Sequence, residues 1–484
     1  MLEANETRSS QSGGVSARSS VRPFGRSLFL CCALLLLATT LAGSESATEG
    51  SGGVVQSEAV PSRDEVNRAI ALAAGYLERS CGPDGKFAYK VEIGSGRQSA
   101  SYDIIRHAGA MYSLAMFNQS HPDPEAVSAL IRAAKFLRQN YIGEGPRPGQ
   151  RVIWSQPLDR SSDPTRSNGK QAILRERYAE LGGTGLGLVA LAATREVDPS
   201  SVPLEELQAL GRFALFLQRD DGSFVQKYRA EGGPVPNWHS LYYPGEAALG
   251  FIALYEADHS SEWLTAAGRT LSYLAMSRVG VSKVPADQWA LIATAKLLPY
   301  CEKDSCGASR EDLVQHAVQI CNSILRNQFR GSAAVGLDGA FDSTGHTAVA
   351  ATLLEGLLAA LEFLPMRGLR DRIEAATERG IAFLLRAQVL SGPRAGAMPG
   401  AIAIRARDSL EVRIDYVQHA LSAWIRYVSM SRVKAATRHP DDPEPDGPKV
   451  RLKKIGTRAA SVSGGWLPVF SGLRIGAHER SARL

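Results

Sequence analysis

Apolar residues recur at helical spacing through most of the chain, in two alternating kinds of segment. In the first kind, charged residues fill one face, as in Asp64-Glu65-Val66-Asn67-Arg68-Ala69-Ile70. In the second kind, most positions are apolar and Ala and Gly are frequent, as in Ala348-Val349-Ala350-Ala351. A helix with a polar face lies at a surface, whereas a helix with little polar surface is buried on most sides. The pattern therefore predicts an alternation of outer and inner helices.

Six helices of each kind are expected, and the two kinds alternate strictly along the chain. The amphipathic helices are predicted at residues 64–81, 124–140, 203–219, 261–278, 309–328 and 369–389. The apolar helices are predicted at residues 101–118, 178–194, 242–257, 284–299, 342–363 and 410–430. Three amphipathic helices are followed by a turn that contains Asp84-Gly85, Asp221-Gly222 or Asp338-Gly339 and then an aromatic residue. Self-similarity at this period predicts stacked helical hairpins.

This alternation resembles that of the α/α-toroid superfamily, which includes six-hairpin glycosidases, polysaccharide lyases, uronyl epimerases, terpene cyclases and prenyltransferase β-subunits. The resemblance covers about residues 60 to 430. It implies an all-α (α/α)6 toroid, in which inner helices surround a central cavity and outer helices surround the inner ones. Because one fold hosts many functions, the resemblance implies an architecture rather than a reaction.

Both ends of the chain differ from this pattern. Arg18, Arg22 and Arg26 precede the apolar stretch 28–41, and the small residues at 42–44 suit a cleavage site. This order predicts a signal peptide and an exported protein, periplasmic or extracellular. An uncleaved segment that anchors the protein in a membrane is the alternative, although the stretch is shorter than the roughly 20 residues of a membrane span. The expected organisation is 1–47 signal or anchor, 48–60 linker, 61–431 toroid and 432–484 a basic, Pro-containing disordered tail.

Composition excludes several kinds of partner. The net charge of +6 comes partly from the tails, and no basic run lies in the helical region, so no nucleic acid partner is expected. We expect no metal, because Cys-x-x-Cys and His-x-x-x-His spacings are missing, and no cofactor, because no phosphate-binding or dinucleotide motif is present. An exported chain permits disulfides, and Cys301 and Cys306 are close enough in sequence to pair. For Cys81 and Cys321, buried free thiols are at least as good an interpretation as a disulfide.

Polar residues gather at the N-terminal ends of the apolar helices, and these ends meet at one mouth if the ring closes. The predicted catalytic residues are Asp103, Arg106, His107, Glu246, Asp415 and His419. The predicted substrate-binding residues are Tyr102, Trp238, Tyr243, Asp287, Trp289, His346 and Tyr416. Asp residues at helix starts also serve as caps, so this interpretation stays open for Asp103, Asp287 and Asp415.

These residue types favour a carbohydrate or uronate polymer as the substrate. Paired carboxylates hydrolyse glycosidic bonds, and aromatic rings suit stacking on sugars. Elimination or epimerisation of a uronate would instead use Arg106 to neutralise the substrate and His107, Tyr243 or His419 to move a proton. The sequence does not choose between these chemistries.

Two other kinds of function remain open from the sequence. One is a non-catalytic toroid that binds or scaffolds. The other is a terpenoid cyclase-like enzyme, which the low aromatic content of 7% and the lack of a DxDD motif disfavour. The segment 141–177 contains no helical pattern and is expected to form a lid or a substrate-binding flap at the mouth.

Overall fold

The computed structural model describes residues 60–158, 177–301, 306–331, 336–403 and 410–437. The predicted signal or anchor at 1–47, nearly all of the predicted linker, and the tail beyond 437 lie outside these residues. Within the described residues, no helix is both long enough and apolar enough to span a membrane.

Twelve α-helices form in the described residues, in the predicted alternation. The outer helices are α1 (Arg63–Ser80), α3 (Pro124–Tyr141), α5 (Leu204–Leu217), α7 (Ser261–Ser277), α9 (Arg310–Leu325) and α11 (Arg367–Ala387). The inner helices are α2 (Ile104–Ser120), α4 (Leu181–Val197), α6 (Tyr243–Asp258), α8 (Gln288–Cys301), α10 (Thr347–Ala360) and α12 (Ile414–Thr437). The last helix continues beyond residue 431, where the toroid was expected to end.

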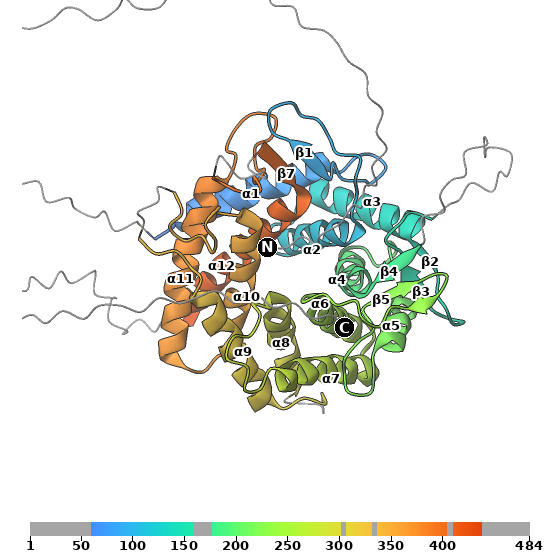
Figure 1. Cartoon of the computed structure of the whole chain (residues 1–484). Coiled ribbons are helices and arrows are strands. Elements are labelled where there is room, and N and C mark those ends of the chain that lie inside the picture. The colour runs from blue at the N-terminus through green and yellow to red at the C-terminus, as the bar shows by residue number, and fades with distance from the viewer. Residues whose placement is uncertain (1–59, 159–176, 302–305, 332–335, 404–409, 438–484) are drawn as a thin grey trace, which may run out of the picture. The chain divides into compact units, whose positions relative to one another are not determined.

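The inner helices form a closed ring. Each packs against the next, from α2 through α12, and α12 packs against α2. In Figure 1 the six inner helices surround the centre and the outer helices lie around them. The prediction of an all-α (α/α)6 toroid is confirmed. We call the end of the ring where the inner helices begin the N-terminal mouth, and the opposite end the C-terminal mouth.

The glycine-rich start of α4 allows two inner helices to pack closely. A Cβ atom at Gly185 would lie 2.6 Å from the backbone nitrogen of Ala247 in α6, and one at Gly250 would lie 2.7 Å from the carbonyl oxygen of Gly185. Since carbon atoms cannot approach backbone atoms so closely, only glycine permits this helix separation. The run Gly182–Gly187 therefore serves helix packing.

Four glycine turns each lie against the next outer helix. Gly85 lies against the carbonyl of Arg132 in α3, and its φ of +84° is one that L side chains rarely adopt. Gly222, Gly339 and Gly396 make the same approach to Arg269, Arg379 and Leu72. The last of these contacts runs from the end of α11 to α1, so it closes the outer ring as well.

Short strands, which the sequence analysis did not predict, form between the helices. Their bounds are β1 (Lys90–Glu92), β2 (Ile142–Glu144), β3 (Arg151–Ile153), β4 (Tyr178–Glu180), β5 (Lys227–Arg229), β6 (Gly233–Pro234) and β7 (Glu411–Arg413). All pairs are antiparallel: β1 with β7, β2 with β3, and β5 with both β4 and β6. In the β1–β7 pair, Lys90 lies opposite Arg413, which joins the first hairpin to the last.

Two further expectations need comment. The segment 141–177 was expected to lack regular structure, but it begins with the β2–β3 hairpin, whereas residues 159–176 of the expected lid lie outside the described residues. Cys301 and Cys306 form a disulfide with a Cα–Cα distance of 5.0 Å, while Cys81 and Cys321 are buried free thiols.

Candidate active site

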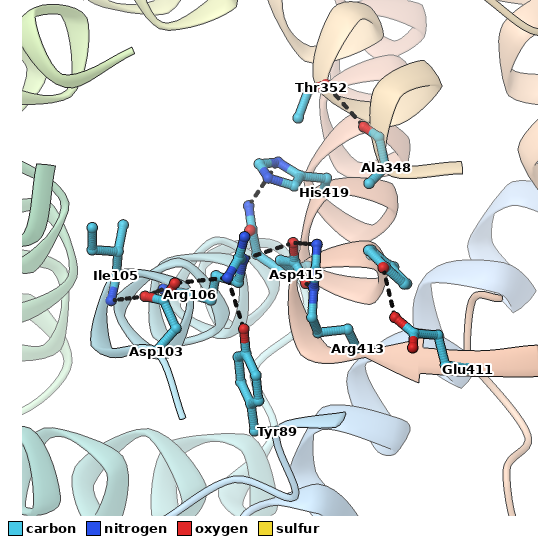
Figure 2. A network of polar contacts seen from close by, with 12 residues as sticks. Tyr89, Asp103, Ile105, Arg106, Ala348, Thr352, Glu411, Arg413, Asp415 and His419 are labelled. Atoms are coloured by element: carbon cyan, nitrogen blue, oxygen red, sulfur yellow. Dashed lines mark hydrogen bonds and ion pairs between the residues drawn. The ribbon is translucent and has the colours of Figure 1, made fainter. Parts of the chain in front are cut away.

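Arg106 is the centre of a charged network at the N-terminal mouth. Its guanidinium lies 2.7 Å from a carboxylate oxygen of Asp103 and 3.2 Å from one of Asp415, and it donates a 2.7 Å hydrogen bond to the hydroxyl of Tyr89. Asp415 also accepts from Arg413 at 2.7 Å. Figure 2 shows these side chains facing one another from α2, α12 and the two strands beside them. The network joins the first and last hairpins.

Asp415 remains ionised in this network although it is buried. Burial alone would raise the pKa of its carboxyl, but Arg106 and Arg413 more than offset this effect, and the pKa lies below its ordinary value. Burial opposes the charge of Arg106 in the same way, and Asp415 and Asp103 outweigh it, so its pKa is raised. Asp103 also caps α2 by accepting from the backbone of Ile105 at 2.9 Å.

A second group of side chains lies at the N-terminal ends of α4 and α6. The hydroxyl of Tyr243 donates to Glu180 at 3.1 Å, and the ammonium of Lys227 lies 3.5 Å from the same carboxylate. The ring of Trp238 lies 5.4 Å from that of Tyr243, and Lys227 lies over the ring of Tyr178 at 3.8 Å. The mouth therefore offers an aromatic surface next to a paired carboxylate.

Glu246 is a buried carboxyl next to this group. The residue is 5% exposed, and its Oε2 atom has no hydrogen-bond partner among the described residues. Burial raises the pKa of Glu246 to about 8, and the carboxylates of Asp287, Asp103 and Glu180 add to the effect. A Cβ atom at Gly182 would lie 2.3 Å from Oε2, so the glycine makes room for the acid. Glu246 therefore holds a proton at neutral pH.

His419 lies one turn along α12 from Asp415 and is paired with a buried carboxylate. Its Nδ1 atom lies 2.8 Å from Oε2 of Glu355, which is 1% exposed and belongs to α10. The side chain of Gln418 lies 3.1 Å from the same nitrogen. A carboxylate on one ring nitrogen orients the imidazole and leaves the other nitrogen for proton transfer.

Several predicted site residues lie in the core instead of at the mouth. His107 is completely buried, with its ring nitrogens 2.7 Å from the Tyr102 hydroxyl and 3.0 Å from the Ala133 carbonyl. Burial lowers the pKa of His107 to about 4, so the ring is neutral. Asp287 is also completely buried, and it pairs with Arg278 at 2.9 Å. These contacts hold helices together rather than face a substrate.

Of three further predicted residues, Trp289 and Tyr416 are buried and His346 is partly exposed. Trp289 is 2% exposed, and its ring lies 6.4 Å from that of His419. The hydroxyl of Tyr416 donates to Glu411 at 3.1 Å. His346 precedes α10, and its Nδ1 atom lies 2.6 Å from the hydroxyl of Thr344.

Tyr89, Lys227 and Glu355 are among the side chains in the site that the sequence analysis did not single out. Tyr89 and Lys227 lie next to or in three-residue strands, which are too short to show a periodicity. Glu355 gave a visible signal, because it is the single charged residue in the apolar run Leu353–Leu358. A buried carboxylate in such a run requires a partner.

The described residues contain no group of three or more His, Cys, Asp and Glu side chains that could hold a metal ion. A cavity of about 620 Å³ lies in the ring, but its lining comes from the second halves of the inner helices. It therefore opens at the C-terminal mouth, away from the charged network, and we place the candidate active site by its side chains rather than by this cavity.

Comparison with known proteins gives similarity in structure alone. No family model matches the chain, and no curated protein matches it in sequence. Among solved structures, it is similar to a cellobiose 2-epimerase from Bacillus thermoamylovorans, with a TM-score of 0.57, 10% identity, and coverage of 76% of this chain and 99% of that one.

Two further structures show the same likeness. A sugar epimerase from a ruminal bacterium has a TM-score of 0.56 and 11% identity over 76% of this chain and 98% of its own. A GH76 α-mannanase from Bacteroides thetaiotaomicron has a TM-score of 0.54 and 12% identity over 76% and 97%. At such identities the likeness shows the fold, and the chain therefore has the six-hairpin toroid fold of these proteins.

Proposed function

We propose that this chain is a carbohydrate-active enzyme whose active site is the N-terminal mouth. The observation that carries the proposal is the placement of the proton-holding Glu246 beside Glu180, Tyr243 and the ring of Trp238. The fold likeness to sugar epimerases and an α-mannanase supports it. A site that places a carboxyl of raised pKa beside a second carboxyl and an aromatic surface suits a saccharide.

The charges at the mouth favour a neutral saccharide. Arg106 and Arg413 face Asp103 and Asp415, and Lys227 faces Glu180, so each of these three cations already has a carboxylate partner. A uronate would need an additional cation to balance its own carboxylate. We therefore place hydrolysis of a neutral glycoside first, with Glu246 as the acid that protonates the departing oxygen and Glu180 as the nucleophile or base.

Epimerisation of a sugar is the second candidate, and the pair of His419 and Glu355 favours it. A base of this kind removes a proton from a carbon atom next to a carbonyl, and Glu246 would supply a proton in return. The two reactions can be distinguished by their products. Hydrolysis releases a new reducing end, whereas epimerisation in D2O introduces deuterium at the sugar carbon.

The purified full chain should be incubated with neutral oligosaccharides, among them α-mannans and cellobiose, and with uronate polymers. We expect turnover of a neutral substrate, and Glu246→Gln should lower kcat at least 100-fold because general acid catalysis contributes roughly 10² to 10⁴. The matched control is Glu205→Gln, at an exposed glutamate of α5. Equal activity of the Glu246→Gln variant and the parent would contradict the site assignment.

We also propose that the protein is exported, with residues 1–47 as signal or anchor. The disulfide between Cys301 and Cys306 supports this proposal, because disulfides persist in oxidising compartments. We expect fractionation of the producing cells to find the protein outside the cytoplasm. N-terminal sequencing of that protein then shows whether the signal has been cleaved. A chain that keeps both thiols reduced in the cytoplasm would contradict the proposal.

A further inference from the structure

The cavity at the C-terminal mouth has the size and lining of a ligand site. Its volume of about 620 Å³ lies within the range of 300 to 1,000 Å³ that is typical of small-molecule pockets. Its walls are aliphatic side chains and Met residues from four inner helices, among them Val189, Leu249, Ile252 and Ile425. The apolar wall faces the axis of the ring, so the body of a ligand there would be apolar.

The cations at this mouth already have partners. Lys296 lies 3.7 Å from Glu256, and Arg426 lies 3.4 Å from Glu362 and 3.4 Å from the hydroxyl of Tyr112. Arg370 donates to the carbonyl oxygens of Leu361 and Leu364 after α10. Together, these three cations balance the three carboxylates of the lining, so its side chains carry no net charge.

The negative potential at the rim comes from one carboxylate that has no ion pair in the described part of the chain and from the helix ends. Glu196 lines the cavity near the end of α4, accepts from the amide of Gln119 at 3.1 Å, and forms no ion pair among the described residues. The helices α2, α4 and α6 end beside the cavity, and a helix C-terminus carries about half a negative charge. An apolar cavity below a negative rim favours a molecule with an apolar body and a cationic head.

We propose that the C-terminal mouth is a second binding site, which takes a small amphiphilic cation. The apolar body lies among Val189, Ile252 and Ile425, and its ammonium or guanidinium group lies at Glu196. This site is separate from the candidate active site, since the two lie at opposite ends of the inner helices. The proposal therefore does not depend on the proposed carbohydrate chemistry.

Three probes of equal chain length test the charge preference: octylammonium, octanoate and octanamide. Their binding to the full chain should be measured by calorimetry below the concentrations at which they aggregate. We expect saturable binding of octylammonium that is at least tenfold tighter than that of the other two. Equal or tighter binding of octanoate would overturn the assignment of a cationic ligand, and no saturable binding of octylammonium would overturn the site.

Variants then test the location. Ala253→Phe fills the cavity and should weaken octylammonium binding at least tenfold, with Ala71→Phe on the exposed face of α1 as its control. Glu196→Gln keeps the hydrogen bond from Gln119 and should weaken binding about fivefold, with Glu205→Gln as its control. Glu246→Gln should leave binding unchanged. Loss of binding in Glu246→Gln, or full binding in both cavity variants, would overturn the location.

Discussion

At the scale of single residues, Asp415 joins two arginines that would otherwise repel one another. It lies 3.2 Å from Arg106 and 2.7 Å from Arg413, and it is 7% exposed. Asp415→Asn would leave two guanidinium groups without this shared anion, and removing one partner of a buried pair costs 3 to 5 kcal/mol. Because both arginines are partly exposed, we expect a loss of about 2 kcal/mol in the free energy of unfolding, measured by urea titration.

The matched control for this variant is Glu144→Gln, since Glu144 and its partner Arg151 are both exposed at the side chain. Exposed pairs contribute roughly 0 to 1 kcal/mol, so the control should change stability little. A loss in Asp415→Asn no larger than in the control would show that the network does not hold the first and last hairpins together.

Glu246 gives stability a pH dependence whose sign follows from its pKa. The pKa is raised from its ordinary value of 4.5 to about 8, so the folded chain binds this proton more tightly than the unfolded chain. The contribution of Glu246 to the free energy of unfolding is therefore largest below pH 4.5. This contribution falls as pH rises towards 8, by at most about 1.4 kcal/mol per pH unit.

Glu246→Gln should remove this contribution while other groups keep theirs. The difference in unfolding free energy between parent and variant, measured by denaturant titration at several pH values from 5 to 8, should shift steadily in favour of the variant as pH rises. A difference that stays constant with pH would mean that Glu246 is not buried as a neutral acid.

At the scale of elements, the glycine turns leave little room for change. A Cβ atom at Gly396 would lie 1.8 Å from the carbonyl oxygen of Leu72, whereas one at Gly392 has nothing within 4 Å. Both residues have positive φ values, of 91° and 77°. Substitution by Ala at either position adds backbone strain of about 1 to 2 kcal/mol, and only Gly396→Ala adds a collision with the first outer helix.

We therefore expect Gly396→Ala to destabilise the chain at least 2 kcal/mol more than Gly392→Ala does, as measured by the midpoint and slope of urea unfolding. The comparison cancels the strain that both variants share. Equal losses in the two variants would mean that the turn can move away from α1 without cost.

The sequence allowed the helices to be predicted, but not the strands. Helical periodicity repeats over many residues, as in α1 and α11, and so it is visible without the fold. The strands contain at most three residues, and β1 pairs with β7 only after the ring has closed. This pairing brings Tyr89 to Arg106, and Arg413 to the carboxylate of Asp415 that Arg106 also contacts, which explains why a linear search could not connect all three arginine and tyrosine side chains.

At the scale of the whole molecule, ring closure decides which predicted site residues meet. Arg106 and Asp415 are 309 positions apart, yet they touch because α12 packs against α2. The prediction that polar helix starts converge depended on this closure. It did not distinguish a residue that faces the mouth from one that faces the outer helices, as His107 does, because the two directions differ only by a rotation about the helix axis.

Closure also predicts how the molecule unfolds. In an open array of repeats, each hairpin contacts only its neighbours, and the ends can fray independently. In this ring, Gln388 donates to the carbonyl of Ala69 at 3.0 Å across the junction of last and first hairpins. Gln328 makes the corresponding 2.7 Å bond to Ala376 between two hairpins that are consecutive in the chain. The two glutamines are 6% and 7% exposed.

Because both interfaces belong to one closed ring, Gln388→Ala and Gln328→Ala should lower the free energy of unfolding by similar amounts, about 0.5 to 1.5 kcal/mol each, since each removes a buried hydrogen bond between hairpins. Amide hydrogen exchange should accelerate in α7, on the far side of the ring, for both variants alike. If Gln388→Ala instead accelerated exchange in α1 and α11 alone, the junction would open without the rest of the ring, and the molecule would behave as an open array whose ends only touch.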